Sequence, residues 1–190
     1  MITVVRYTPE LRNDLEHFVE EIKQYDLFNW SSIERLKTDK ITYFMAYYHN
    51  KIISINGCYN YKDTDWILFT RQFTIPKYFK LIKRSGSKIW ASMSIPTRFL
   101  ALPSLQYALD KGAKSMFYCI NVSADNIGWK DGLFPLRHAE QMIKSDIISY
   151  AGVHDINSVP QHVFRVHIKN MIVFLNKIAN LPLRLNDEIT

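Results

Sequence analysis

The chain has 190 residues, enough for one domain built around a single hydrophobic core. Hydrophobic residues make up 47% of it and charged residues 22%, which excludes an intrinsically disordered chain. No apolar run is long enough to span a bilayer, and the start lacks the basic-then-apolar layout of a signal peptide. We therefore expect one domain over 1–190, with no membrane partner, in the cytoplasm (the host cytoplasm if the protein is viral).

The formal net charge is +6, which favours an anionic partner such as a nucleotide cofactor, a nucleic acid or an acidic protein. The basic residues are dispersed, and the densest group, within 77–88, suits either a solvated surface or a phosphate-binding patch. Cys58 and Cys119 lie far apart without metal-type spacing, so free thiols are expected.

Apolar patterns bounded by turn residues mark the elements of the first half of the chain. Strands are expected at 2–7, 42–48, 51–61 and 66–75, and helices at 9–25 and just after Ser32. Thr8 and Pro9 suit the start of the first helix, as its cap and its first residue. His49-Asn50 joins two strands into a hairpin, and Pro76 ends the last strand.

The second half begins with a stretch without a clean period, 77–94. Helices are expected at 97–111, 136–144 and 171–178, and strands at 116–122, 147–153 and 163–168. Pro103 lies inside the first of these helices, which predicts a kink there or a start only at about Ser104. Lys111-Gly112 ends that helix with a cation and a left-handed glycine.

This order predicts a mixed α/β (α+β) sheet of six or seven strands with helices on both faces. The strands of 2–7 and 42–75 are expected to be antiparallel. Strands 66–75 and 115–122 are expected to be parallel and splayed, and helix 97–111 should join them through a right-handed crossover.

The order resembles that of the GNAT superfamily, the N-acyltransferases that use acyl-coenzyme A. The likeness runs from Ile2 to Ile168 and is best over Arg71–Asn121, where a helix ends in Gly112-Ala113 before a buried strand. Four phrases look more narrowly like GNAT-like proteins of tailed phages; they are Trp30-Ser31-Ser32-Ile33, Ile52-Ile53-Ser54-Ile55-Asn56-Gly57, Ile67-Leu68-Phe69-Thr70-Arg71 and Gln161-His162-Val163-Phe164-Arg165-Val166. The resemblance implies the GNAT-like fold and transfer of an acyl group from acetyl-CoA or another acyl-CoA to an unknown amine.

The resemblance also implies a cofactor site between strands 66–75 and 115–122, at their carboxyl ends. Backbone groups of Phe73 and Ile75 would pair with the pantetheine arm. The side chains expected around the cofactor and the acceptor are those of Lys88, Thr97 and Arg98 at the phosphates, and Asn121, Asn126 and Arg71 near the arm or the acceptor.

The sequence departs from the family in two places. The family binds pyrophosphate in a Gln/Arg-x-x-Gly-x-Gly/Ala loop, whereas Ser92–Arg98 contains no glycine and Pro96 removes a donor. Either the insert 77–94 rebuilds the phosphate site, or the cofactor is not bound. Helix 136–144 has Ile143 where the family places a general-acid tyrosine, which leaves Tyr150 and Asp65 as catalytic candidates; Asp65 also suits a turn.

Arg71 lies in a central strand, where an arginine is expensive to bury unless it is paired. Simple alternation places it on the same face as Phe69 and Phe73. Its partner is then either a carboxylate, Asp65 or Glu34, or an anionic group bound in the cleft.

The competing hypothesis is a non-catalytic GNAT-like module that binds nucleic acid or a protein partner. The missing glycines favour it. Its base-stacking residues would be Tyr47, Tyr48, Tyr59 and Tyr61 with Lys51, Lys62 and Arg71, although the tyrosines also suit the wet rim of a core. A metal is not expected, because His162 and His167 lie five apart and so on opposite faces of one strand.

Overall fold

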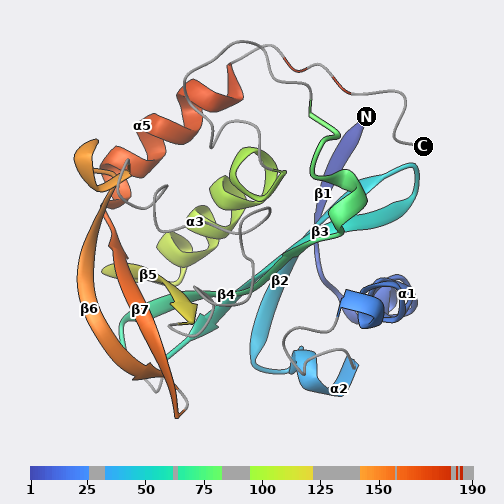
Figure 1. Ribbon diagram of the computed structural model, residues 1–190, viewed down its shortest axis with the longest axis horizontal. Helices are drawn as coiled ribbons and strands as arrows, with labels where there is room; N and C mark the ends of the chain where they lie inside the picture. The colour runs from blue at the N-terminus through green and yellow to red at the C-terminus, as the bar shows by residue number, and fades with distance from the viewer. Residues whose placement is uncertain are drawn as a thin grey trace.

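The computed structural model describes residues 1–25, 33–61, 64–82, 95–121, 142–156, 158–180, 183 and 185. Within them the strands form one mixed seven-stranded sheet, in the order β1-β2-β3-β4-β5-β7-β6. Figure 1 shows this sheet as a twisted layer with helices on either side. The predicted mixed sheet with helices on both faces is confirmed.

Most strands follow the expected positions closely. They are β1 (Ile2–Arg6), β2 (Ile41–Tyr48), β3 (Lys51–Asn60), β4 (Trp66–Thr74), β5 (Ser115–Asn121), β6 (Ile148–Ile156) and β7 (Val159–Val166). The helical segments are η1 (Pro9–Leu11), α1 (Arg12–Ile22), η2 (Lys23–Tyr25), α2 (Ile33–Leu36), η3 (Pro76–Tyr78), η5 (Pro96–Leu100), α3 (Ala101–Asp110) and α5 (Ile168–Ala179).

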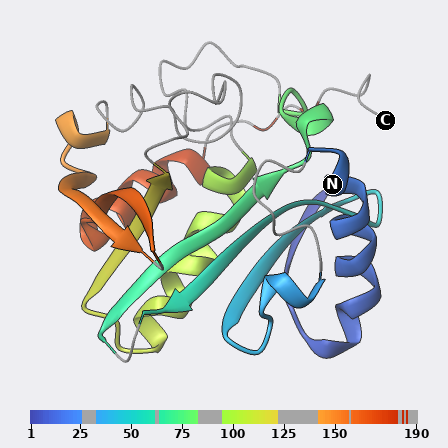
Figure 2. The same cartoon turned by 60° about the horizontal axis from the view of Figure 1, so that its bottom comes forward.

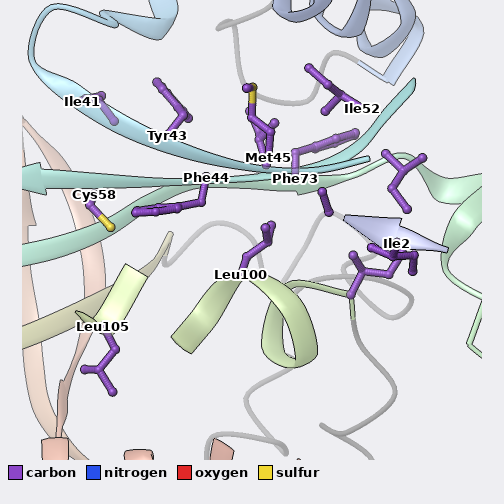
Figure 3. Packing of buried hydrophobic residues seen from close by; sticks show 14 of the residues in the cluster. Ile2, Ile41, Tyr43, Phe44, Met45, Ile52, Cys58, Phe73, Leu100 and Leu105 are labelled. Carbon is purple, nitrogen blue, oxygen red and sulfur yellow. The ribbon is translucent and has the colours of Figure 1, made fainter. Parts of the chain in front are cut away.

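Two hydrophobic layers hold the sheet between its helices. In Figure 3, Tyr43, Met45 and Phe73 lie on the side of α1, and Phe44 and Cys58 lie on the side of α3. Figure 2 shows α3 and α5 together on one face, with α1 and α2 across the sheet. The helix α1 buries an apolar stripe against the sheet; its members are Leu15, Phe18, Val19 and Ile22. Thr8 precedes η1, but its side chain makes no capping hydrogen bond to the backbone, contrary to the prediction.

The strand connections confirm most of the expected topology. β2 and β3 form the predicted hairpin, and His49 and Asn50 both have a positive φ at its turn, of 48° and 59°. β4 and β5 are parallel, as predicted, and η5 and α3 lie between them in the chain. The last two strands run further into their connection than predicted, and β7 lies between β5 and β6.

The helix that contains Pro103 begins at Pro96, within one residue of the expected start, and not at about Ser104. A π-helical turn, η5, leads directly into α3, and the Ala101 N–H bonds to the Pro96 carbonyl oxygen, five residues back. Pro103 has no N–H to give the Phe99 carbonyl, which disturbs the α-helical ladder in the turn before the proline. The Ser104 hydroxyl donates to the Leu100 carbonyl at 2.7 Å, so it satisfies one acceptor of this irregular turn.

No helix within the described ranges has both the length and the apolar character needed to cross a bilayer. The two cysteines are free: Cys58 is buried and Cys119 is half-buried.

Gly57 provides a test of the packing between β2, β3 and β4. A Cβ atom at this position would meet Ile41 Cγ2 at 2.7 Å and the Thr70 carbonyl oxygen at 2.9 Å, and a backbone atom in a sheet moves little. We expect Gly57→Ala to lower the free energy of unfolding by about 1–3 kcal/mol in a denaturant titration. The control is Gly112→Asn, because Gly112 has open space around it and asparagine tolerates its φ of 72°. Equal stability losses in the two variants would contradict this packing.

Candidate functional site

The candidate site is built around a β-bulge in β4. Gly57 of β3 pairs with Thr70, and Ile55 pairs with Phe73, so Asn56 alone stands opposite two residues, Arg71 and Gln72. Arg71 has a φ of 50°, in the left-handed region that residues other than glycine seldom adopt. A bulge of this kind adds one residue to a strand and changes which side chains share a face.

Because of the bulge, Arg71 lies on a different face of the sheet, relative to Phe69, from the one that alternation predicted. Cys58 pairs with Phe69 and Ile55 with Phe73; Ile55 and Cys58 are three residues apart, so Phe69 and Phe73 lie on opposite faces. The Arg71 side chain hydrogen-bonds to Tyr43, on the face of α1 and α2. Arg71 therefore shares a face with Phe73 and lies opposite Phe69.

Tyr43 links Arg71 to α2. The Tyr43 hydroxyl donates to the Leu36 carbonyl oxygen at 2.7 Å, and the ring is fully buried. Burial raises the pKa of Tyr43 well above its usual range, and the nearby Arg71 charge only partly opposes this. The phenol is therefore neutral at physiological pH and cannot neutralise the guanidinium.

β4 separates from β5 at the bulge. The two strands pair from Trp66–Phe69 against Ser115–Tyr118, and of the described strands only β3 pairs with β4 from there to Thr74. This confirms the predicted splayed arrangement. The carboxyl-terminal half of β4 therefore offers an edge toward β5 at which a ligand can take the place of a strand partner.

The backbone groups of β4 that face away from β3 are not those of Phe73 and Ile75, as expected from the sequence, but those one residue earlier. The Ile75 N–H already donates to the Ile53 carbonyl at 3.0 Å, and the Phe73 carbonyl accepts from the Ser54 hydroxyl at 3.1 Å. Backbone groups along a strand point alternately to its two neighbours. Those of Gln72 and Thr74 are consequently the ones directed away from β3, toward β5.

Asn56 is a candidate that the sequence reasoning missed. Its side chain is 3% exposed and donates to the Ser104 hydroxyl of α3 at 2.8 Å. Its Oδ1 is buried and accepts no hydrogen bond in the described part of the molecule. A lone asparagine in the apolar run of β3 is the sequence feature that could have drawn attention to it.

The other expected cofactor residues are placed in part. Arg98 lies in η5, half-buried, and burial lowers the pKa of its guanidinium. Thr97 also lies in η5, and Asn121 ends β5, but the side chains of both are outside the described part, as are Lys88 and Asn126 altogether.

The two catalytic candidates lie away from the splayed edge of β4. Asp65 precedes β4 and lies 3.7 Å from Lys114 Nζ, at the opposite end of the strand, about 23 Å from Phe73 by strand geometry. This placement fits a turn residue. Tyr150 is 49% exposed on the outermost strand β6, where its hydroxyl lies 3.0 Å from His162 Nδ1.

The aromatic residues of the nucleic-acid hypothesis do not gather on one surface. Tyr48 is 5% exposed, and the Tyr47 hydroxyl bonds to Asp14 at 2.9 Å. Tyr59 lies at the other end of β3 from the hairpin turn that follows Tyr48, and Lys62 is outside the described residues. The described residues thus offer no stacking platform.

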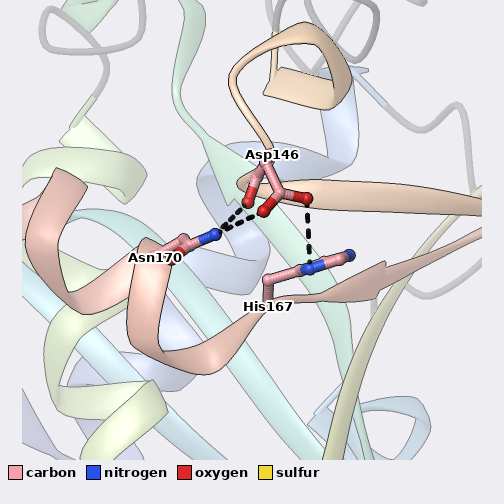
Figure 4. Close-up of polar contacts among 3 residues, drawn as sticks. All are labelled: Asp146, His167 and Asn170. Carbon is pink, nitrogen blue, oxygen red and sulfur yellow. Dashed lines mark hydrogen bonds and ion pairs between the residues drawn. The ribbon is translucent and has the colours of Figure 1, made fainter.

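A polar cluster joins the start of α5 to the turn before β6 (Figure 4). Asn170 donates to the Asp146 carbonyl at 2.6 Å and to its carboxylate at 2.8 Å, and His167 Nδ1 lies 3.4 Å from the same carboxylate. Beside it is an open pocket of about 480 Å³ whose basic lining residues are Lys114, Arg165, His167 and Lys169. The cluster lies at the end of the sheet where β5 starts, away from the splayed edge. Among the described residues no three of His, Cys, Asp and Glu gather as a metal site would require.

The thiols supply a prediction about reactivity. Burial raises the pKa of both Cys58 and Cys119 to about 12, so both are protonated at neutral pH and neither is an activated nucleophile. We expect a disulfide reagent to modify the native protein slowly at pH 8 and the urea-unfolded protein rapidly. Rapid modification of native Cys58→Ser, which retains only Cys119, would contradict the raised pKa of the half-buried Cys119 thiol.

Comparison with known proteins identifies the fold. No family model and no curated protein matches the sequence. Among solved structures, a GNAT-family acetyltransferase from Staphylococcus aureus matches with a TM-score of 0.52 and 11% identity, over 87% of this chain and 98% of that one. An aminoglycoside 6'-N-acetyltransferase complexed with coenzyme A matches with a TM-score of 0.54 and 11% identity, over 87% and 97%.

The ribosomal-protein-S18-alanine N-acetyltransferase of Escherichia coli matches equally well. Its TM-score is 0.53, with 12% identity over 87% of this chain and 93% of that one. At such identities the likeness concerns the arrangement of the backbone and not the chemistry. The chain has the fold of the GNAT acetyltransferases.

Proposed function

We propose that the protein is an acyl-CoA-dependent N-acyltransferase, which transfers an acyl group from acetyl-CoA or another acyl-CoA to an amine. The observation that carries the proposal is the edge of β4 that β5 leaves unpaired beyond Phe69, in a chain with the GNAT acetyltransferase fold. The non-catalytic alternative gains no support from the described residues, since the aromatic side chains it needs are buried or dispersed.

The pantetheine arm of coenzyme A fits this edge, because an arm with amide groups can pair with strand backbone. In the proposed complex the backbone groups of Gln72 and Thr74 bind it, in place of the Phe73 and Ile75 groups expected from the sequence. Thr74 is held in position by its hydroxyl, which lies 2.7 Å from the Ser54 hydroxyl. Asn56 Oδ1 is also a buried acceptor beside the bulge.

The phosphates are proposed to lie at the start of the helix formed by η5 and α3. The first N–H groups of a helix have no partner within it, and they favour anions. Arg98 adds a cation in this turn. Since Pro96 removes one N–H and the glycines of the family loop are missing, we propose a phosphate site that depends more on side-chain charge than on backbone donors.

The reaction needs little from the protein beyond positioning of the thioester and the amine. Coenzyme A supplies a thioester; the acceptor nitrogen bonds to the acyl carbon, the carbon–sulfur bond breaks, and the amine's proton leaves with the thiol or to water. Holding an amine and a thioester together at the right orientation accounts for most of the rate such a reaction needs. The bulge and the Ser54–Thr74 contact fix the edge of β4 that orients one of the two partners.

Binding of the cofactor tests the proposal directly. We expect acetyl-CoA to raise the melting temperature and to give a saturable heat in calorimetry; at a hundredfold excess over Kd the stabilisation is about 2.7 kcal/mol. Release of free CoA in the presence of a panel of small amines would then identify turnover. The absence of both heat and thermal shift at about 1 mM acetyl-CoA would remove the proposal.

Arg98 is the cation whose loss should weaken cofactor binding. We expect Arg98→Met to raise the Kd for coenzyme A about tenfold, or about 1.4 kcal/mol, and to flatten its salt dependence, because a phosphate contact is lost. Lys111→Met is the matched control, since Lys111 directly follows the other end of the same helix. An unchanged Kd in Arg98→Met, with CoA bound, would show that the phosphates lie elsewhere.

A further inference from the structure

We propose that Arg71 binds a carboxylate of the acyl acceptor, so that the preferred acceptor is an amine that also carries a carboxylate group. The inference rests on the proposed function and names the substrate class of the same site. Its basis is the position of one guanidinium, which the bulge in β4 turns onto the face of α1 and α2, where no described residue gives it a charged partner.

The guanidinium has an unused donor in a buried place. Among the described residues, Arg71 NH1 is buried without a hydrogen-bond partner, and Arg71 also hydrogen-bonds to the neutral Tyr43 hydroxyl. An arginine stays protonated in proteins, so this donor cannot be relieved by loss of the proton. A bound oxyanion would satisfy both the donor and the charge.

Neither structural partner expected for Arg71 is in place. Asp65 lies against Lys114 beyond the far end of β4, and Glu34 is exposed on α2, where its charge acts on Arg12. In the part of the chain that the structure describes, no carboxylate forms an ion pair with Arg71. A ligand can therefore supply the negative charge that balances the guanidinium.

The Arg71 site and the proposed phosphate site lie on opposite faces of the sheet. The helix of η5 and α3 packs on the other face, where Asn56 and Cys58 both hydrogen-bond to Ser104. Arg71 instead contacts Tyr43, whose hydroxyl bonds to Leu36 of α2. A molecule bound along the edge of β4 can thus have its phosphates on one face, while the second substrate approaches Arg71 from the other.

The number of charges favours a carboxylate over a phosphate. Among the described residues, Arg71 is the only charged side chain that acts on the Tyr43 hydroxyl. One guanidinium matches the single charge of a carboxylate, and its planar donors suit two carboxylate oxygens. A phosphate dianion would leave one charge unbalanced in a partly buried place.

The position of Arg71 in the strand agrees with a ligand-binding role. Its left-handed backbone is an uncommon conformation for an arginine, and such residues are concentrated at binding and catalytic sites. The residue also lies where pairing between β4 and β5 has just ended, next to the edge proposed to hold the thioester. A carboxylate bound there would place the amine of a short acceptor near that edge.

The test uses the full chain and product-like probes that need no turnover. N-acetylglycine, N-acetyl-β-alanine and N-acetyl-4-aminobutyrate are each titrated against the corresponding carboxamide, with and without saturating coenzyme A. We expect at least one of the acids to bind tenfold or more tightly than its amide. In Arg71→Met that preference should vanish, and in Arg71→Lys it should be reduced. Arg165→Met, which removes an exposed cation from β7, should keep it.

The outcomes separate this inference from the proposed function. Coenzyme A binding to the wild-type protein without any preference for an acid over its amide overturns the carboxylate site alone. Failure of coenzyme A to bind removes the proposed function, even where an Arg71-dependent acid preference persists. Tighter binding of N-acetylphosphoethanolamine than of every acid would overturn the choice of carboxylate. Should Arg71→Met fail to fold, the wild-type pairs and Arg71→Lys still decide the question.

Discussion

One extra residue in β4 determines the geometry of the candidate site. Because Arg71 and Gln72 together oppose Asn56, every side chain of β4 beyond Thr70 changes face relative to strict alternation. Phe73 therefore packs against α1, with its ring 6.4 Å from that of Phe18. The same extra residue sets which backbone groups of the strand point toward β5. This one irregularity therefore determines which face each later side chain occupies, which backbone groups point toward β5, and on which face the Arg71 guanidinium lies.

The parts of the fold that could be predicted are those marked by local chemistry. His49-Asn50 tolerates the left-handed turn of a tight hairpin, Gly112 ends α3 with a φ of 72°, and apolar residues at helical spacing define α1. The parallel contact of β4 and β5 follows from the strand–helix–strand order. The hairpin, the helix end and α1 depend on residues close together in the chain, and the contact of β4 with β5 depends on the order of elements, so one sequence is enough to find them.

The candidate site was less accessible to sequence reasoning because its key feature has no local signature. The left-handed position in the bulge is usually taken by glycine, asparagine or aspartate, and here it is an arginine between Thr70 and Gln72. The bulge results from how β3 and β4 pair, which residue types alone do not specify. Alternation thus placed Arg71 with Phe69, and the expected backbone contacts fell one residue away from Gln72 and Thr74.

The bulge persists because contacts on both sides of it hold β4 in place. Before it, Thr70 pairs with Gly57; after it, Thr74 and the Phe73 carbonyl are both held by the Ser54 hydroxyl. A left-handed arginine costs about 1–2 kcal/mol, and a buried polar atom without a partner about 1–3 kcal/mol. Arg71 NH1 and Asn56 Oδ1 are both buried without a partner among the described residues, so each incurs this cost of an unpaired polar atom. The two residues lie opposite each other in the pairing of β3 with β4. In the part of the chain that the structure describes, Arg71 leaves a donor unpaired on the face of α1 and Asn56 leaves an acceptor unpaired on the face of α3, so a ligand that bound on either face of the bulge would remove the cost carried by that face.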